Sequence, residues 1–140
     1  MAVVGLSYGV ATIYLFDYFR KMEIKDATPA LAALGHATRL SVFRLLVEAG
    51  PEGRMAGDIA EALSLAGPTL SFHLKELSAA GLIQGEQRGR YICYRADFET
   101  MNELISFLTS NCCGGKPDAA CLPAAAKALK GRAPAKGARA

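Results

Sequence analysis

Residues 56–81 have the sequence AGDIAEALSLAGPTLSFHLKELSAAG, in which two amphipathic segments flank a short break. Apolar residues recur at the helical spacing i, i+3, i+4, i+7: Ala56, Ile59, Ala60 and Leu63 in the first segment, and Leu70, Leu74 and Leu77 in the second. The four-residue break ends in Gly67, and Pro68 suits the first turn of the following helix. This pattern predicts a helix-turn-helix, although any helical hairpin of a small α domain has similar spacing.

Two further helices are predicted before this segment. Thr28 and Pro29 have the pattern of an N-cap followed by proline at the first helical position, and this helix should continue to about Gly35. The next helix should span residues 38–49 and end at Gly50-Pro51. Its expected apolar face consists of Leu40, Phe43, Leu46 and Val47.

After Gly81 the pattern changes from helix to strand. Residues 82–86 and 91–95 are rich in β-forming types and are joined by the basic turn 87–90, which predicts a hairpin. Asp97 is a plausible N-cap for a last helix that reaches about Asn111. Its apolar surface is wide enough to be buried on two sides, against the domain core and against a partner subunit: Phe98, Met101, Leu104, Ile105, Phe107 and Leu108.

The element order α-α-α-α-β-β-α, with a small β-hairpin wing, predicts a mainly α winged helix-turn-helix fold. We divide the chain into residues 1–25 (an N-terminal arm or extension), 26–113 (the DNA-binding and dimerisation domain) and 114–140 (a flexible basic tail). The first 16 residues are uncharged, but glycine and polar residues interrupt the run and no basic n-region precedes it. An extension that starts before a true initiator at Met22, a part of a dimer interface and a membrane anchor all remain open for this segment.

The net charge of +3 is poor evidence for a nucleic-acid partner because of where it lies. Residues 114–140 hold six basic residues and one acidic residue, so the other 113 residues have a net charge of −2. Local clusters therefore decide whether the domain suits DNA.

Two such clusters are present. In the second helix of the helix-turn-helix, a hydroxyl-rich face with one cation points away from the leucine stripe and suits phosphate and groove contacts: Pro68, Thr69, Ser71, Phe72 and Lys75. His73 lies at the edge of the buried face, where it is either a packed core residue or a DNA contact. In the hairpin, Arg88 and Arg90 flank Gly89 and have the place of a DNA-binding wing, although a solvated charged loop has the same composition.

Three segments together resemble the ArsR/SmtB family of metalloregulatory repressors. They are LAALGHATRLSVFRLL at 31–46, GPTLSFHLKEL at 67–77, and AGLI at 80–83 with the Gly-Arg-Tyr hairpin at 89–91. The resemblance covers roughly residues 30–113. It implies a homodimer whose first and last helices form the interface, two recognition helices in successive major grooves of a double-stranded DNA operator, and repression that an inducer relieves.

Four cysteines without a secretory signal favour metal or redox chemistry in a cytoplasmic protein over structural disulfides. Cys112 and Cys113 lie where the last helix ends, and the two glycines that follow allow the chain to unwind so that both sulfurs face one ion. Cys121 is the candidate third ligand. Three thiolates suit As(III) or Sb(III), whereas zinc prefers four ligands. The negative end of a helix disfavours thiolates, and so weakens a site for a divalent cation. Arsenous acid is neutral and binds thiols without a change in net charge, so it is less affected by this position.

The family resemblance extends to this site. Asn111-Cys112-Cys113 with a later cysteine is similar to some arsenic-responsive members, whereas the better-known Cys-x-Cys motif is absent and residues 55–60 occupy its place. Inert cysteines, a redox switch that pairs Cys112 or Cys113 with Cys121, and a divalent-metal sensor remain alternatives. A thiol enzyme is disfavoured because no histidine or phosphate-binding loop lies nearby in sequence. Cys93 is expected to be a packed strand residue. We expect no organic cofactor and no membrane partner.

Overall fold

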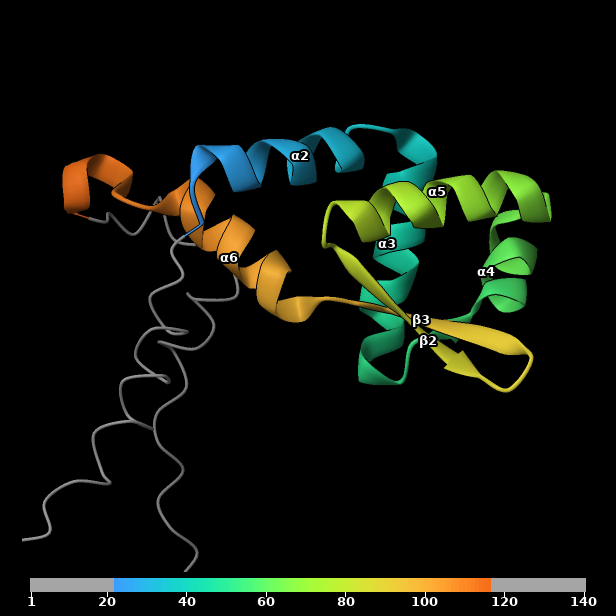
Figure 1. Cartoon of the computed structure of the whole chain (residues 1–140). Coiled ribbons are helices and arrows are strands. Elements are labelled where there is room, and N and C mark those ends of the chain that lie inside the picture. Colours follow the sequence, from blue (N-terminus) through green and yellow to red (C-terminus); the bar gives the residue numbers. More distant parts are fainter. Residues whose placement is uncertain (1–21, 117–140) are drawn as a thin grey trace, which may run out of the picture. The chain divides into compact units, whose positions relative to one another are not determined.

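The computed structural model describes residues 22–116 (Figure 1). Its elements, in chain order, are α2 (Ile24–Leu34), α3 (Ala37–Ala49), the short 3-10 helix η1 (Gly50–Glu52), β1 (Arg54–Met55), α4 (Ala56–Leu63), α5 (Gly67–Ala79), β2 (Ile83–Arg88), β3 (Tyr91–Ala96), α6 (Phe98–Thr109) and the 3-10 helix η2 (Cys112–Gly115). The predicted order of four helices, a hairpin and a last helix is confirmed. The short strand β1 was not predicted.

The described residues divide into two compact units, with the boundary between Phe107 and Leu108. The first contains the helix-turn-helix and the hairpin, and the second contains η2 with its two cysteines. No single helix in residues 22–116 is long and apolar enough to cross a bilayer, although α2 and residues 37–52, bent by 101°, meet the requirement for length and composition as a pair.

The start of α2 differs from the sequence-based expectation. The helix begins at Ile24, where Glu23 is the N-cap and the Asp26 carboxylate accepts a hydrogen bond from the Glu23 N–H at 3.1 Å. Thr28 is therefore not a cap; its hydroxyl donates to the Ile24 carbonyl. Pro29 lies inside the helix, not at its first position. The reciprocal hydrogen bonds of Glu23 and Asp26 satisfy backbone N–H groups of the first turn. The helix therefore begins about one turn before Thr28-Pro29, the more typical start signal.

The buried face of α3 is also rotated from the expected one. Val42, Phe43 and Leu46 are buried, whereas Leu40, a predicted core residue, is 45% exposed. Two residues along a helix correspond to a rotation of about 200°. Because Val42 faces inward, Leu40 lies on the opposite side.

Three antiparallel strands form a small sheet in the order β1-β3-β2. In the hairpin Arg88 pairs with Tyr91, so the turn consists of Gly89 and Arg90 alone and is shorter than the predicted 87–90 loop. On the other edge, the chain reaches β1 through Gly53, which has φ +70°. A Cβ at this position would lie 2.3 Å from the Tyr94 carbonyl oxygen, so glycine is required there.

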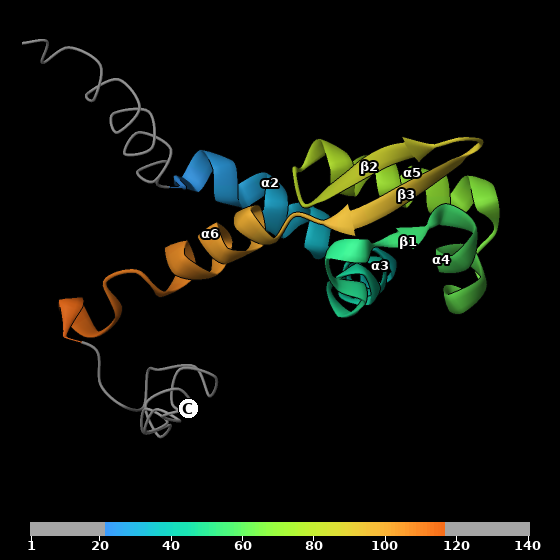
Figure 2. The ribbon, with the colours of Figure 1, turned by 90° about the horizontal axis from the view of Figure 1, so that it is seen from below.

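A single apolar core joins the helices to the sheet. Its most deeply buried large side chains come from α3, α4, α5 and the start of the hairpin: Val42, Leu46, Ile59, Leu70, Leu77 and Leu82. From α6, Leu104 joins the same cluster with Ala27 and Ala30 of α2, and the two helices lie side by side (Figures 1 and 2). The first and last helices of the described domain therefore share one edge of the core.

The boundaries of α6 follow from local chemistry. The Asp97 carboxylate accepts a hydrogen bond from the Thr100 N–H at 2.9 Å, which confirms its predicted role as an N-cap. The helix ends at Thr109, slightly before the predicted Asn111, which has φ +54°. An asparagine in the left-handed region is a common end to a helix.

Candidate nucleic-acid interface and thiol site

The α4–α5 pair has the geometry of a helix-turn-helix. The connection passes through Ser64, whose φ of +53° reverses the chain after α4, and α5 then begins at Gly67. The leucine stripe of α5 packs into the core, so the opposite side of the helix is left on the surface. Every residue predicted for that outer face is exposed: Pro68, Thr69, Ser71, Phe72 and Lys75.

Phe72 is the most unusual residue of this face. Its side chain is 57% exposed on α5, although a large aromatic residue on a small domain is usually covered. Its neighbours Ser71 and Lys75 supply a hydroxyl and a cation. The face therefore combines a hydroxyl and a cation, groups of the kind that contact phosphates, with one apolar group of the kind that contacts a thymine methyl.

His73 lies on the buried side of α5, only 7% exposed, which is the packed one of its two predicted positions. Its ring contacts that of His36 at 4.9 Å between centroids and lies edge-on to Phe72 at 5.6 Å. Burial is the main cause that lowers the pKa of His73 below its usual 6.5; repulsion from a protonated His36 and from Arg39 lowers it further, against an opposing effect of Glu76.

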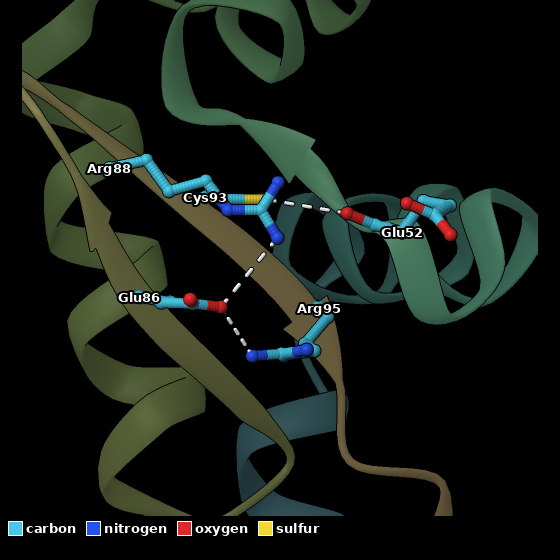
Figure 3. A network of polar contacts seen from close by, with 5 residues as sticks. All are labelled: Glu52, Glu86, Arg88, Cys93 and Arg95. Carbon is cyan, nitrogen blue, oxygen red and sulfur yellow. Dashed lines mark hydrogen bonds and ion pairs between the residues drawn. The ribbon is translucent and has the colours of Figure 1, made fainter.

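The hairpin carries the second predicted cluster, but its cations are not equivalent. Arg88 lies 3.6 Å from the carboxylate of Glu86, which also forms an ion pair with Arg95 at 2.5 Å (Figure 3). Arg90 lies in the turn and is exposed. The turn itself is held by a hydrogen bond from the Gln87 side chain to the Gly89 carbonyl. One carboxylate thus partly neutralises the base of the wing and leaves its tip basic.

Cys93 is the predicted packed strand residue. Its side chain is 4% exposed, and its thiol donates to the Glu52 carbonyl at 3.4 Å (Figure 3). This contact ties β3 to η1. The cysteine lies within the core of the first unit and takes no part in the thiol pair of the second.

The end of the last helix brings two thiols together. The backbone leaves the helical conformation at Asn111, and Cys113 and Gly114 also have positive φ values of +53° and +66°. As a result the sulfurs of Cys112 and Cys113 lie 3.7 Å apart, although adjacent side chains of a regular helix diverge. Cys112 is half-buried and Cys113 is exposed, and neither is in a disulfide. Cys121, the third predicted ligand, lies outside the described residues.

This spacing fits a single soft ion. Thiolate–metal bonds are about 2.3 Å long, so two sulfurs bound to one ion lie at most about 4.6 Å apart. The observed 3.7 Å meets that condition without rearrangement. In residues 22–116, no group of three or more His, Cys, Asp or Glu side chains is arranged to hold a metal. The pair therefore needs a third ligand from elsewhere, or a ligand that requires only two sulfurs.

Three features were not predicted, and each depends on contacts between distant residues. They are the two-residue strand β1, the bridging position of Glu86 and the contact between the two histidines. Arg88 lies two residues after Glu86 on the same face of β2, and Arg95 lies diagonally across the hairpin from Glu86, which pairs with Cys93. The contact between Glu86 and Arg95 can therefore be predicted from the sequence only when the length of the turn is known.

Comparisons with known proteins agree with this architecture. A model of a helix-turn-helix domain matches residues 34–86. The HTH-type transcriptional repressor SmtB of Mycobacterium tuberculosis is 38% identical over 74 residues, which are 52% of this chain and 53% of that protein. The HTH-type transcriptional regulator YgaV of Escherichia coli is 28% identical over 89 residues, 64% of this chain and 88% of that protein. The chain thus spans about half the length of the first curated relatives.

Among solved structures, an ArsR-like transcriptional regulator from Rhodococcus sp. RHA1 superposes with a TM-score of 0.54 at 28% identity. The match covers 60% of this chain and 76% of that one. The sequence-based expectation of a winged helix-turn-helix is therefore confirmed. In sequence and in fold, the chain is similar to transcriptional regulators of the ArsR/SmtB family, which are not enzymes.

Proposed function

We propose that the protein is a homodimeric transcriptional repressor that binds an operator through α5 and the wing, and that As(III) or Sb(III) releases it by binding Cys112 and Cys113. Cys121 is the proposed third ligand. The observation that carries the inducer assignment is the 3.7 Å separation of the two sulfurs at the unwound end of the last helix.

The exposed side of α5 supports the DNA-binding role. Thr69, Ser71 and Lys75 offer donors to phosphate oxygens, and Phe72 offers an apolar contact to a base. In the wing, Arg90 is exposed at the tip, where it can reach a phosphate or a minor groove. The related SmtB and YgaV are described as a transcriptional repressor and a transcriptional regulator, which agrees with this role.

Apolar side chains on the first and last helices support dimerisation. Ile24 and Leu31 of α2 are 73% and 43% exposed, and Ile105 of α6 is 48% exposed. Burial of apolar surface stabilises an association by about 25 cal/mol per Å². A second copy of the chain that covers these helices would remove this surface from water and would place two α5 helices in one assembly.

The chemistry of trivalent arsenic suits thiols at a helix end. Arsenous acid exchanges each hydroxyl for a thiolate sulfur and releases one water, so that three cysteine thiols and As(OH)3 give an As(SR)3 centre, three waters and no change in net charge. A neutral product is tolerated at the negative end of a helix better than free thiolates are. Two half-sites must be engaged together about 34–36 Å apart. A small change in α6 therefore suffices to weaken operator binding, and a coupling of about 1–3 kcal/mol corresponds to roughly 5–150-fold.

The test compares arsenite-dependent release of DNA among cysteine variants. We expect arsenite to weaken binding of the full chain to a DNA site selected by the protein itself, and we expect Cys112→Ser and Cys113→Ser to abolish that response. Cys93→Ala is the matched control, because this cysteine is buried in the first unit and should leave the response intact. The site assignment is wrong if both serine variants still release DNA. X-ray absorption of the arsenic-loaded protein should report three As–S bonds, and two bonds would exclude Cys121.

A further inference from the structure

The two histidines of this chain contact each other where α5 meets the start of α3. His36 directly precedes α3 and His73 lies in α5, with ring centroids 4.9 Å apart and planes inclined by 41°. The contact joins residues 37 positions apart in the sequence and lies on the buried side of α5, away from the face proposed to meet DNA. It therefore serves a purpose other than base or phosphate recognition.

The role of His36 requires an unprotonated ring nitrogen. His36 is the N-cap of α3, and its Nδ1 accepts a hydrogen bond from the Thr38 N–H at 3.2 Å. A proton on Nδ1 would replace this acceptor with a donor that faces another donor. It would also place a positive charge at the N-terminus of a helix, where the helix dipole opposes it.

His73 favours the neutral form because it is buried. Its side chain is 7% exposed, and its Nδ1 is buried without a hydrogen-bond partner among the described residues. Adding a proton there would bury a charge without a partner, which is costly. Burial is accordingly the largest of the influences that lower the pKa of this imidazole.

The charges around His73 add to this effect. Arg39 of α3 is fixed nearby, because its Nε donates to the Ala33 carbonyl at 2.6 Å, and His36 would be a second cation if it were protonated. Glu76, on α5 itself, acts in the opposite direction but is exposed. The charged residues of α2, Lys25 and Asp26, lie in its first turn, at the end of that helix far from His36.

We propose that the His36–His73 contact is a proton-sensitive joint that holds α5 against the corner between α2 and α3 only while the buried imidazole of His73 is neutral. In the unfolded chain His73 has its ordinary pKa of 6.5, and in the folded chain the pKa is lower. Well above pH 6.5 neither state takes up a proton, so pH has no effect through this group. As pH falls through 6.5 the unfolded chain gains protons first, and the folded state loses stability.

The direct test is an NMR titration of the full chain. Because the chain has two histidines, each imidazole Cε1–H gives one signal, and His36→Asn assigns the pair. We expect the His73 signal to stay at its neutral position well below pH 6.5 for as long as the protein is folded. A His73 signal that titrates at pH 6.5 or above in the folded protein would overturn the proposal.

A second test measures unfolding by urea between pH 8 and pH 5.5, followed by circular dichroism because the chain has no tryptophan. We expect the midpoint of the wild-type chain to fall on acidification, with an uptake of up to about one proton on unfolding through His73. His73→Leu should remove this uptake, since leucine packs as an apolar residue, and His36→Asn should reduce it, since asparagine is a good N-cap but removes the imidazole beside His73. An uptake unchanged in both variants would contradict the joint.

The consequence for operator binding rests on the proposed function. If α5 is the recognition helix, DNA affinity should decline below pH 6.5 in the wild type and less steeply in His73→Leu, without arsenite. A chain that shows the NMR and urea behaviour but binds no DNA at any pH would leave the joint intact and refute the repressor assignment. If DNA affinity depends on pH equally in the wild type and in His73→Leu, the joint does not control the position of α5 for DNA binding.

Discussion

Glu86 shows how one side chain controls the charge of the wing. Its carboxylate bridges Arg88 and Arg95, and therefore competes with any phosphate that approaches Arg88 (Figure 3). Because all three side chains are substantially exposed, these ion pairs contribute little to the stability of the fold. We expect them to act mainly on DNA binding.

We predict that Glu86→Gln strengthens DNA binding at low salt and steepens its salt dependence, with the slope of log K against log salt increasing in magnitude by about 0.9, equivalent to one additional phosphate contact. The measurement is fluorescence anisotropy over a series of salt concentrations. Glu99→Gln is the matched control, since it makes the same change in net charge on an exposed residue of α6. An equal gain in both variants would show that overall charge, and not the release of Arg88, is responsible.

At the scale of the element, α6 depends on the cap at its first turn. The Asp97 carboxylate accepts from the Thr100 N–H and from the Gln84 side chain at 2.6 Å, so it also ties the helix to β2. We predict that Asp97→Ala lowers the free energy of unfolding by about 1 kcal/mol, the usual cost of a lost N-cap. Asp97→Asn, which keeps an acceptor for Thr100, should lose much less. Urea unfolding at pH 7.5 distinguishes the two, and equal losses would assign the effect to charge.

Elements with a strong local signal were the predictable ones. The apolar periodicity of α4 and α5 and the change of period after Gly81 suffice for the helix-turn-helix and hairpin. The start of α2 was missed because a Glu23–Asp26 pair outweighed the more typical Thr28-Pro29 signal. The strand β1 was missed because two residues carry no periodicity and its pairing with β3 joins distant segments. For the same reason the 3.7 Å approach of the two thiols was only a possibility until the backbone at Asn111 was known.

At the scale of the whole molecule, the proposed dimer is the feature most open to direct test. Leu31 of α2 and Leu40 of α3 are almost equally exposed, at 43% and 45%. Of these two helices, α2 lies beside α6 (Figure 2), and the proposed interface consists of α2 and α6. We predict that Leu31→Glu converts a dimer to a monomer and weakens operator binding at least tenfold, because two half-sites are no longer engaged together. Leu40→Glu should remain dimeric. Sedimentation velocity measures the oligomeric state of each variant. If both variants are dimers, or both are monomers, the interface does not lie specifically on α2.

Gly53 imposes a constraint of another kind. Because a methyl group there would meet the Tyr94 carbonyl at 2.3 Å, even alanine would separate the first strand from the other two. The hairpin would then lose its third strand and depend on its packing against α3 and α5, because two strands alone are only marginally stable in water. The core residues of α2 to α6 stay in place, so we expect such a chain to keep its helical content but to lose the fixed orientation of its wing. In a library of random substitutions screened for a functional repressor, codon 53 should tolerate no replacement, although the residue contacts neither DNA nor inducer in the proposed mechanism.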